Sequence, residues 1–167
     1  MAVERVRTTD EMARAVLARL EESTVVIMTA AVADFRPAGP LPGKLKKHDV
    51  TAIQIEPTRD ILSEIAALRR ADQLVVGFAA ETDHVLENAA AKLRLKRLDM
   101  MVANDVTQYG AGFEVDTNIV TLLFPGGGAK ALEKMSKFDV ANRILDEVIE
   151  LRKAGVRSQA PGVRTNH

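Results

Sequence analysis

Residues 29–47 carry the side chains best suited to binding an anionic ligand. The segment begins with small residues around Asp34 and passes through a loop rich in proline and glycine to a lysine cluster that starts at Lys44. Small side chains let a ligand approach free backbone N–H groups, aspartate can hold a ribose hydroxyl or a metal, and lysines can reach phosphates. The same pattern suits a strand end, a surface loop and a solvated basic run. Composition alone favours that second interpretation.

Three other positions have alternative interpretations. Lys92 and Lys96 are four residues apart, so on a helix their ammonium groups share one face and suit a polyphosphate. A solvated flank of the helix explains the same spacing. Phe78 ends an apolar run and is either a core residue or a wall for a base or ribose. Asp60 suits a helix N-cap, and the start of that helix can also take an anion.

Several chemistries lack their residues in this chain. There is no cysteine, so thiol nucleophiles, disulfides and thiolate metal sites are excluded, and His48, His84 and His167 match no zinc spacing. No G-x-G-x-x-G follows a predicted strand, which disfavours an NAD-type reductase. The glycines at 126–128, followed by Lys130, lack the spacing of a Walker sequence and predict a hairpin turn instead.

The composition describes an ordinary globular chain. Of its 167 residues, 47% are hydrophobic and 28% charged, and 23 basic residues balance 23 acidic ones, so no net field would recruit nucleic acid or an anionic membrane. No apolar run approaches the roughly 20 residues of a membrane span, and the N-terminus lacks a signal-peptide pattern. We therefore expect a cytoplasmic protein with neither nucleic-acid nor membrane partners.

The hydrophobic pattern alternates between strands and helices. Thr8 with Glu11 predicts a capping box, and Thr58 or Asp60 is expected to cap a later helix. Strands are predicted at 24–28, 50–55, 74–78, 100–103, 119–124 and 129–135, with a weak candidate at 3–7, and helices at 8–22, 61–70, 83–97 and 137–153.

This order predicts an α/β fold: a Rossmann-like, doubly wound, mainly parallel sheet with an antiparallel hairpin added late. The loops at 29–47, 56–60, 79–83 and 104–116 each follow a predicted strand, so a parallel sheet would bring all four to one edge. That convergence predicts the binding site. Residues 1–153 form the predicted domain, and residues 154–167 are expected to be a flexible tail.

Taken together, several segments resemble the phosphopantothenoylcysteine synthetase (phosphopantothenate–cysteine ligase) family, the CTP-binding part of bacterial bifunctional coenzyme A biosynthesis flavoproteins. The resemblance runs in order over roughly residues 3–153. It rests on AAVADFRP at 30–37, KLKK at 44–47, DIL at 60–62, GFAAET at 77–82, Lys92 with Lys96, ANDV at 103–106, and Asp116-x-Asn118.

The resemblance implies a two-step ligation. CTP and Mg²⁺ convert the carboxylate of 4′-phosphopantothenate into an acyl cytidylate and release pyrophosphate; the amine of cysteine then displaces CMP. Carboxylate and triphosphate repel one another, so such a site needs several cations. The family also implies a homodimer that uses the 104–135 region, and fusion to a decarboxylase half, absent here, that carries FMN.

The resemblance also assigns site residues. Lys44 matches the catalytic lysine, and Ala31 and Lys44 match positions at the pantothenate end. Asn104 and Asp105 are placed in the same pocket. The matched nucleotide-binding positions are Met28, Thr29, Ala30, Asp34, Lys44, Thr58, Arg59, Asp60, Ile61, Phe78, Lys92 and Lys96. No metal ligand is assigned.

The chain departs from the family pattern at its front. It has neither the glycine-rich first strand and loop nor the Asn-x-Ser-Ser-Gly segment, whose asparagine is thought to stabilise the acyl cytidylate. Two hypotheses follow: an active ligase, and a CTP-binding and dimerisation module with incomplete ligase activity. Because family members differ in their nucleotide, ATP is the alternative to CTP, and the bacterial pattern favours CTP.

Overall fold

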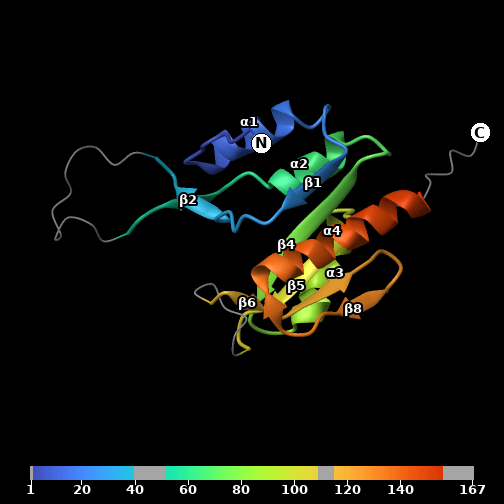
Figure 1. Cartoon of the computed structure of the whole chain (residues 1–167). Helices are drawn as coiled ribbons and strands as arrows, with labels where there is room; N and C mark the ends of the chain where they lie inside the picture. Colours follow the sequence, from blue (N-terminus) through green and yellow to red (C-terminus); the bar gives the residue numbers. More distant parts are fainter. Residues whose placement is uncertain (1, 40–51, 109–114, 156–167) are drawn as a thin grey trace, which may run out of the picture.

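The computed structural model describes residues 2–39, 52–108 and 115–155. Its centre is a five-stranded sheet in the order β1-β4-β5-β7-β8, built from β1 (Val25–Met28), β4 (Leu74–Glu81), β5 (Met100–Asp105), β7 (Val120–Leu123) and β8 (Ala129–Ala131). The pairs β1–β4 and β4–β5 are parallel, whereas β5–β7 and β7–β8 are antiparallel (Figure 1). The predicted α/β class, mainly parallel with a late antiparallel hairpin, is confirmed.

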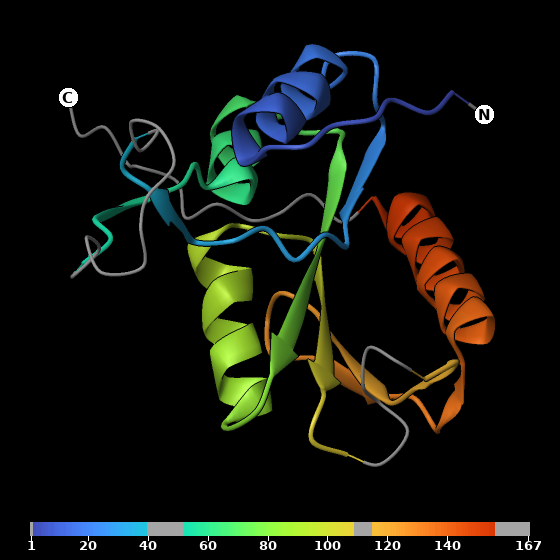
Figure 2. The same ribbon diagram turned by 90° about the vertical axis from the view of Figure 1, so that its left-hand side faces the viewer.

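Helices cover both faces of the sheet, because alternate strand residues point to opposite sides. On one face, α1 (Thr9–Ala18), α2 (Ile61–Leu68) and α3 (Val85–Leu95) pack over the side chains of Val75, Met101 and their neighbours. On the other, α4 (Lys137–Ala154) packs over Val76, Met100 and Val102. Figure 2 shows α3 and α4 on opposite sides of the central strands.

The helix starts follow the sequence. Thr8 caps α1, its hydroxyl accepting a hydrogen bond from the Glu11 N–H at 3.2 Å, and Asp60 caps α2 through the Ser63 N–H at 3.2 Å. The Glu11 carboxylate accepts from the Arg7 N–H at 2.7 Å, one residue before the position that a capping box uses.

Several predicted boundaries are wrong. Residues 3–7 form no strand. The first helix ends at Ala18 instead of residue 22, and a turn follows it. In this turn Leu20 is buried, and the Leu20 carbonyl accepts a hydrogen bond from the Gln73 side chain. The expected return strand at 129–135 is divided between β8 and β9 (Met135–Ser136), and β9 pairs with β6 (Thr117–Asn118).

The strand predicted at 50–55 is also misplaced, because the described residues 52–54 form no strand. β3 covers Ile55–Pro57 and pairs antiparallel with β2 (Phe35–Pro37), within a stretch that the sequence predicted to be loop. The two strands form a separate ribbon beside the sheet (Figure 1). The 56–60 segment therefore does not leave a strand of the main sheet.

Two strands are longer than predicted. β4 continues through Glu81 and β5 through Asp105, because Ala80 pairs with Asn104 and Glu81 with Asp105.

Inside β4, Gly77 lies so close to the turn that follows α3 that a Cβ at this position would meet Leu98 Cδ1 at 2.7 Å. Gly126 and Gly127 have positive φ angles of 88° and 93° in the turn between β7 and β8, as that tight hairpin requires.

Candidate functional site

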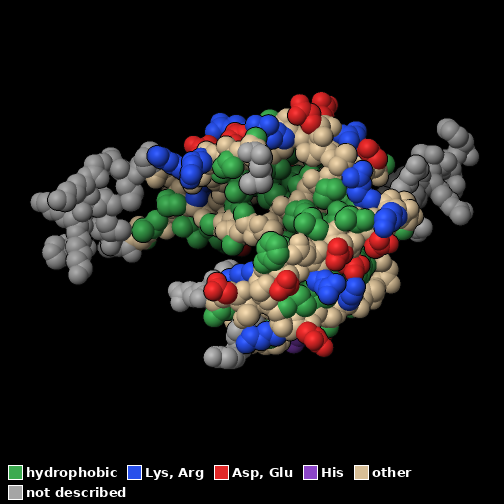
Figure 3. Space-filling model, in the orientation of Figure 1, with side chains coloured by type: hydrophobic (Ala, Val, Ile, Leu, Met, Phe, Trp, Pro, Cys, Tyr) green, Lys and Arg blue, Asp and Glu red, His purple; other side chains and the backbone are tan. Residues whose placement is uncertain are grey.

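A cavity of about 710 Å³ lies over the carboxyl ends of β1, β4 and β5. Figure 3 shows it as a hollow between the β2–β3 ribbon and the half of the molecule that carries α4. It is lined by Met28, Thr29, Ala30, Ala31, Val32, Ala33, Asp34, Thr58, Arg59, Asp60, Ile61, Leu62, Phe78, Ala79, Ala80, Lys92, Lys96, Met101, Asn104, Asn118, Lys137, Val140, Ala141 and Ile144. Carboxyl strand ends are where open α/β sheets bind ligands.

Two segments distant in sequence form one wall. The loop after β1 is held against the start of α2 by Thr58, whose hydroxyl donates to the Ala33 carbonyl and whose N–H donates to the Asp34 carbonyl at 2.8 Å. Arg36 fastens the adjoining ribbon, donating to Glu56 at 2.8 Å and to Asp10 of α1. These carboxylates raise the pKa of Arg36 above its ordinary value. The small residues of the loop thus line the cavity in a position that the hydrogen bonds from Thr58 fix.

Asp60 connects α2 to α3 at the cavity. Its carboxylate caps α2 and accepts from the Ser63 hydroxyl at 2.8 Å and from the Lys96 ammonium. Burial opposes ionisation of this carboxyl, but the hydrogen bonds from Lys96 and Ser63 outweigh burial and lower its pKa. Arg59 beside it is paired with Glu64, 2.9 Å from Nε to Oε1.

Lys92 lies in the last turn of α3, and Lys96 is the C-cap residue one turn further on, with its N–H bonded to the Lys92 carbonyl at 3.0 Å; both line the cavity. Lys92 donates to Glu81 at the end of β4, with Nζ 2.7 Å from Oε1. Two ammonium groups one turn apart, next to the N-terminus of α2, favour a ligand that carries several negative oxygens.

The opposite wall comes from α4 together with Asn118 of β6, and it was not predicted. Lys137 and Asn118 line it together with the apolar side chains of Val140, Ala141 and Ile144. Val140 and Ile144 are buried core residues of α4. That they also border a cavity depends on where α4 crosses the strand ends. Asn118 belongs to a segment of the family pattern, so it could have been assigned from the sequence.

Of the predicted site residues, Lys44 lies outside the described part of the chain. Asp105 lies outside the cavity lining: its carboxylate accepts from the Thr107 hydroxyl and N–H, at 2.6 and 3.0 Å, and from Gln108 at 3.0 Å. These hydrogen bonds lower the pKa of Asp105; the bond from the Thr107 hydroxyl has the largest effect and the bond from Gln108 the next largest. All the other predicted site residues line the cavity.

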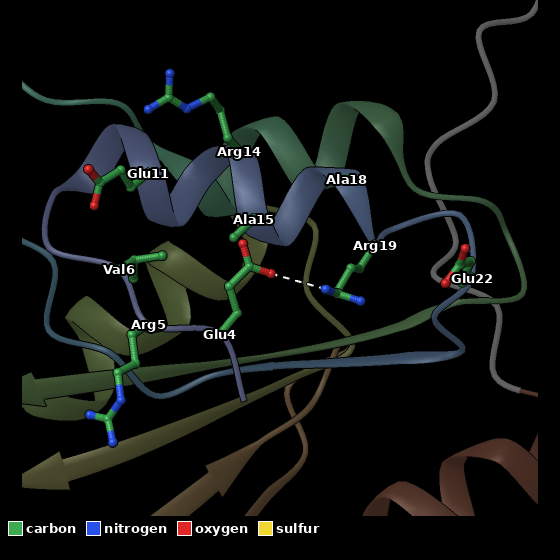
Figure 4. Close-up of a pocket in the computed structure, with 9 residues that line it drawn as sticks. All are labelled: Glu4, Arg5, Val6, Glu11, Arg14, Ala15, Ala18, Arg19 and Glu22. Atoms are coloured by element: carbon green, nitrogen blue, oxygen red, sulfur yellow. Dashed lines mark hydrogen bonds and ion pairs between the residues drawn. The ribbon is translucent and has the colours of Figure 1, made fainter. Parts of the chain in front are cut away.

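A second hollow, of about 550 Å³, lies between the N-terminal residues and α1. Its charged side chains do not converge: Glu4 pairs with Arg19 at 3.1 Å, and Arg5 and Arg14 point away from one another (Figure 4). With charges of both signs and no strand ends beneath it, this hollow lacks the features of a ligand site.

The part of the chain that the structure describes contains no group of three histidine, cysteine or acidic side chains that could hold a metal ion. Over the same residues, none of the helices has the length and apolar character needed to cross a membrane.

Comparison with known proteins agrees with the geometry. Residues 1–151 match the family model described as "DNA/pantothenate metabolism flavoprotein C-terminal domain". The chain is 45% identical over 155 residues to a coenzyme A biosynthesis bifunctional protein CoaBC of Bacillus subtilis (strain 168), covering 92% of this chain and 38% of that protein. It thus spans less than half the length of this relative.

Two solved structures share the fold. The C-terminal domain of a CoaBC protein matches with a TM-score of 0.73 at 35% identity, over 90% of this chain and 66% of that one. A variant of Cab2 in complex with phosphopantothenate-cysteine matches with a TM-score of 0.66 at 17% identity, over 90% of this chain and 52% of that one, a likeness of fold alone. With the family model covering residues 1–151, the chain belongs to the family of DNA/pantothenate metabolism flavoprotein C-terminal domains.

Proposed function

We propose that this chain is the nucleotide-binding domain of a phosphopantothenate–cysteine ligase in coenzyme A biosynthesis, with CTP as its nucleotide. The observation that carries the proposal is the single cavity lined by nearly all the residues that the family pattern assigns to the nucleotide. The 45% identity to a coenzyme A biosynthesis protein supports it. We assign residues 1–153 to this domain.

The lining suggests a division of the cavity. The triphosphate would lie toward Lys92, Lys96 and the α2 N-terminus, where cationic groups and free N–H groups lower the cost of bringing anions together. The small residues Thr29 to Ala31 would contact the nucleotide and the pantothenate end mainly through their backbone. Phe78 would form an apolar wall for the base or ribose.

The proposed reaction has two steps, activation of a carboxylate and then formation of an amide. A carboxylate oxygen of 4′-phosphopantothenate attacks the α-phosphorus of CTP, forming an acyl cytidylate and releasing pyrophosphate. The neutral amine of cysteine then attacks the acyl carbon, forming the amide while the acyl–oxygen bond breaks and CMP leaves. We assign to Lys44 the stabilisation of negative charge at the reacting phosphate and acyl groups.

Mg²⁺ would enter as the metal complex of the nucleotide, shielding the phosphate oxygens. This fits the cavity lining, which supplies the carboxylates of Asp34 and Asp60, because Mg²⁺ in such sites is held mainly by substrate phosphates and water with one or two carboxylates. Asp34 is the cavity carboxylate that we nominate to approach it.

We also propose a cytoplasmic homodimer, with β7 and β8 in the interface, joined in its longer relatives to an FMN-dependent decarboxylase half. β8 is an exposed edge strand of the sheet. Among the described strands it pairs only with β7, so its other side is available to pair with a second copy of the chain. The alternative function is a CTP-binding and dimerisation module with incomplete ligase activity. The two hypotheses differ in whether phosphopantothenoylcysteine forms once CTP is bound.

The test is turnover by the chain supplied with 4′-phosphopantothenate, cysteine, CTP and Mg²⁺. The ligase hypothesis predicts pyrophosphate, CMP and phosphopantothenoylcysteine in equal amounts, and loss of most of this activity in Lys44→Ala but not in Lys47→Ala. CTP binding without any of these products would support the module instead.

A further inference from the structure

Each of the two cavity lysines on α3 is paired with a carboxylate from another element. Lys92 Nζ lies 2.7 Å from Glu81 Oε1 at the end of β4, and Lys96 donates to Asp60 at the start of α2. The two ion pairs connect the C-terminal end of α3 to the end of β4 and to the start of α2. Lys96 is largely buried, whereas about half of the Lys92 side chain is exposed.

Glu81 is well placed to orient Lys92. Its side chain is only 15% exposed, and its backbone is fixed by pairing with Asp105 and by its carbonyl, which accepts from the Val106 N–H at 3.2 Å. Glu81 itself lies outside the set of residues that line the cavity, whereas Lys92 lies inside it. Glu81 thus contacts Lys92 without itself lining the cavity.

A lysine needs such a support in order to bind a phosphate tightly. Its four-carbon stem is flexible, and the rotamer freedom that it would lose on binding a ligand counts against affinity. An ion pair to a rigid carboxylate removes part of that freedom in advance. An ammonium group has three N–H donors, so one bond to Glu81 leaves two for phosphate oxygens.

We propose that Glu81 is a positioning residue, which holds Lys92 toward the outer phosphates of the bound nucleotide, as Asp60 holds Lys96. This rests on the proposed nucleotide function of the cavity. Neither the family pattern nor the cavity lining assigns Glu81 a role. The ligand that benefits is a polyphosphate, because the two supported ammonium groups are spaced by one helical turn.

The experiment measures the dissociation constant of Mg–CTP by calorimetry, and the midpoint of thermal unfolding, for the full chain and its variants. Glu81→Gln keeps the side-chain length without the charge, and Glu81→Asp keeps the charge but withdraws it by one methylene group. Glu87→Gln is the matched control, since Glu87 is exposed in the first turn of α3 and pairs with His84 instead.

We expect Glu81→Gln and Glu81→Asp each to weaken CTP binding about fivefold, and Lys92→Ala about tenfold, as for a lost charge-assisted hydrogen bond. Glu87→Gln should bind as the unaltered chain does. The double variant Glu81→Gln/Lys92→Ala should bind no more weakly than Lys92→Ala alone, because Glu81 acts through Lys92.

The outcomes separate this inference from the proposed function. If Lys92→Ala weakens binding while Glu81→Gln binds as tightly as the unaltered chain or more tightly, Glu81 only neutralises charge and the inference is wrong. If both Glu81 variants lower the unfolding midpoint but leave the dissociation constant unchanged, its role is structural and the inference is again wrong. If Lys92→Ala binds CTP normally, or the unaltered chain binds none, the nucleotide assignment itself fails.

Discussion

Lys96, the C-cap residue of α3, and Asp60, the N-cap residue of α2, form an ion pair at the edge of the cavity. One carboxylate therefore has two roles. It accepts a hydrogen bond from a backbone N–H in the first turn of α2, and it holds the Lys96 ammonium group beside the proposed phosphate site. Because the two roles use different properties of the aspartate, substitutions can separate them.

Asp60→Ala removes both the cap and the ion pair, and we expect it to lower the free energy of unfolding by about 1–2 kcal/mol. Asp60→Asn should cost about 1 kcal/mol or less, because asparagine is also a good N-cap and the lost ion pair is half-exposed. Urea unfolding at neutral pH measures both. Equal losses in the two variants would mean that the cap contributes nothing.

The stability that Asp60 supplies should depend on pH. Its pKa in the folded chain is lowered, so the ionised carboxylate stabilises the fold above the ordinary aspartate pKa of about 3.9, and this contribution is lost as the pH falls through the lowered value. The difference in unfolding free energy between the unaltered chain and Asp60→Asn should therefore shrink from pH 7 to about pH 3. A difference that grows toward acid would contradict the assigned direction.

At the amino end of the central strand β5, Asp99 is a buried acid that joins three elements. Its carboxylate pairs with Arg69 and accepts from the Val75 N–H at 2.7 Å, with only 2% of its side chain exposed. Asp99→Asn leaves the Arg69 guanidinium uncompensated, and we expect a loss of about 3–5 kcal/mol. Asp72→Asn, which breaks an exposed pair with Arg70, should cost less than about 1 kcal/mol. Similar losses for both would show that burial does not matter here.

A methyl group at Gly77 would have to displace the buried side chain of Leu98. The added Cβ would lie 2.7 Å from Leu98 Cδ1 and 3.2 Å from Met101 Cε, so we expect Gly77→Ala to destabilise the chain by about 1–3 kcal/mol. Leu98→Val, which shortens the nearest side chain, should recover part of that loss in the double variant. Gly39→Ala, with open space around it, is the control and should be near neutral. A neutral Gly77→Ala would show that strand β4 can move away from Leu98.

The sequence was sufficient for features that depend on neighbouring residues. Apolar runs located β1, β4 and β5, the acid at Asp60 located a helix start, and the four-residue spacing placed Lys92 and Lys96 on one face. Periodicity says which way a side chain faces but not what it faces. For that reason the pattern at 50–55 did not reveal that β3 pairs with β2 in a ribbon of its own.

The same limit applies to the site. Lys137 lines the cavity because α4 begins beside the strand ends, which no local pattern encodes. Asp105 shows the converse. It follows Asn104 at a strand end, where a ligand-facing residue is expected, but its carboxylate closes a turn onto Thr107.

The central claim is that the cavity binds a nucleoside triphosphate, with CTP preferred to ATP. The most direct measurement is calorimetric titration of the chain with each nucleotide in the presence of Mg²⁺, repeated on Lys96→Ala and on Lys153→Ala, whose lysine pairs with Glu150 on the surface of α4. We predict CTP binding that weakens about tenfold in Lys96→Ala and is unchanged in Lys153→Ala, with weak or no heat from ATP. The absence of binding by either nucleotide, or equal binding by Lys96→Ala, would contradict the account.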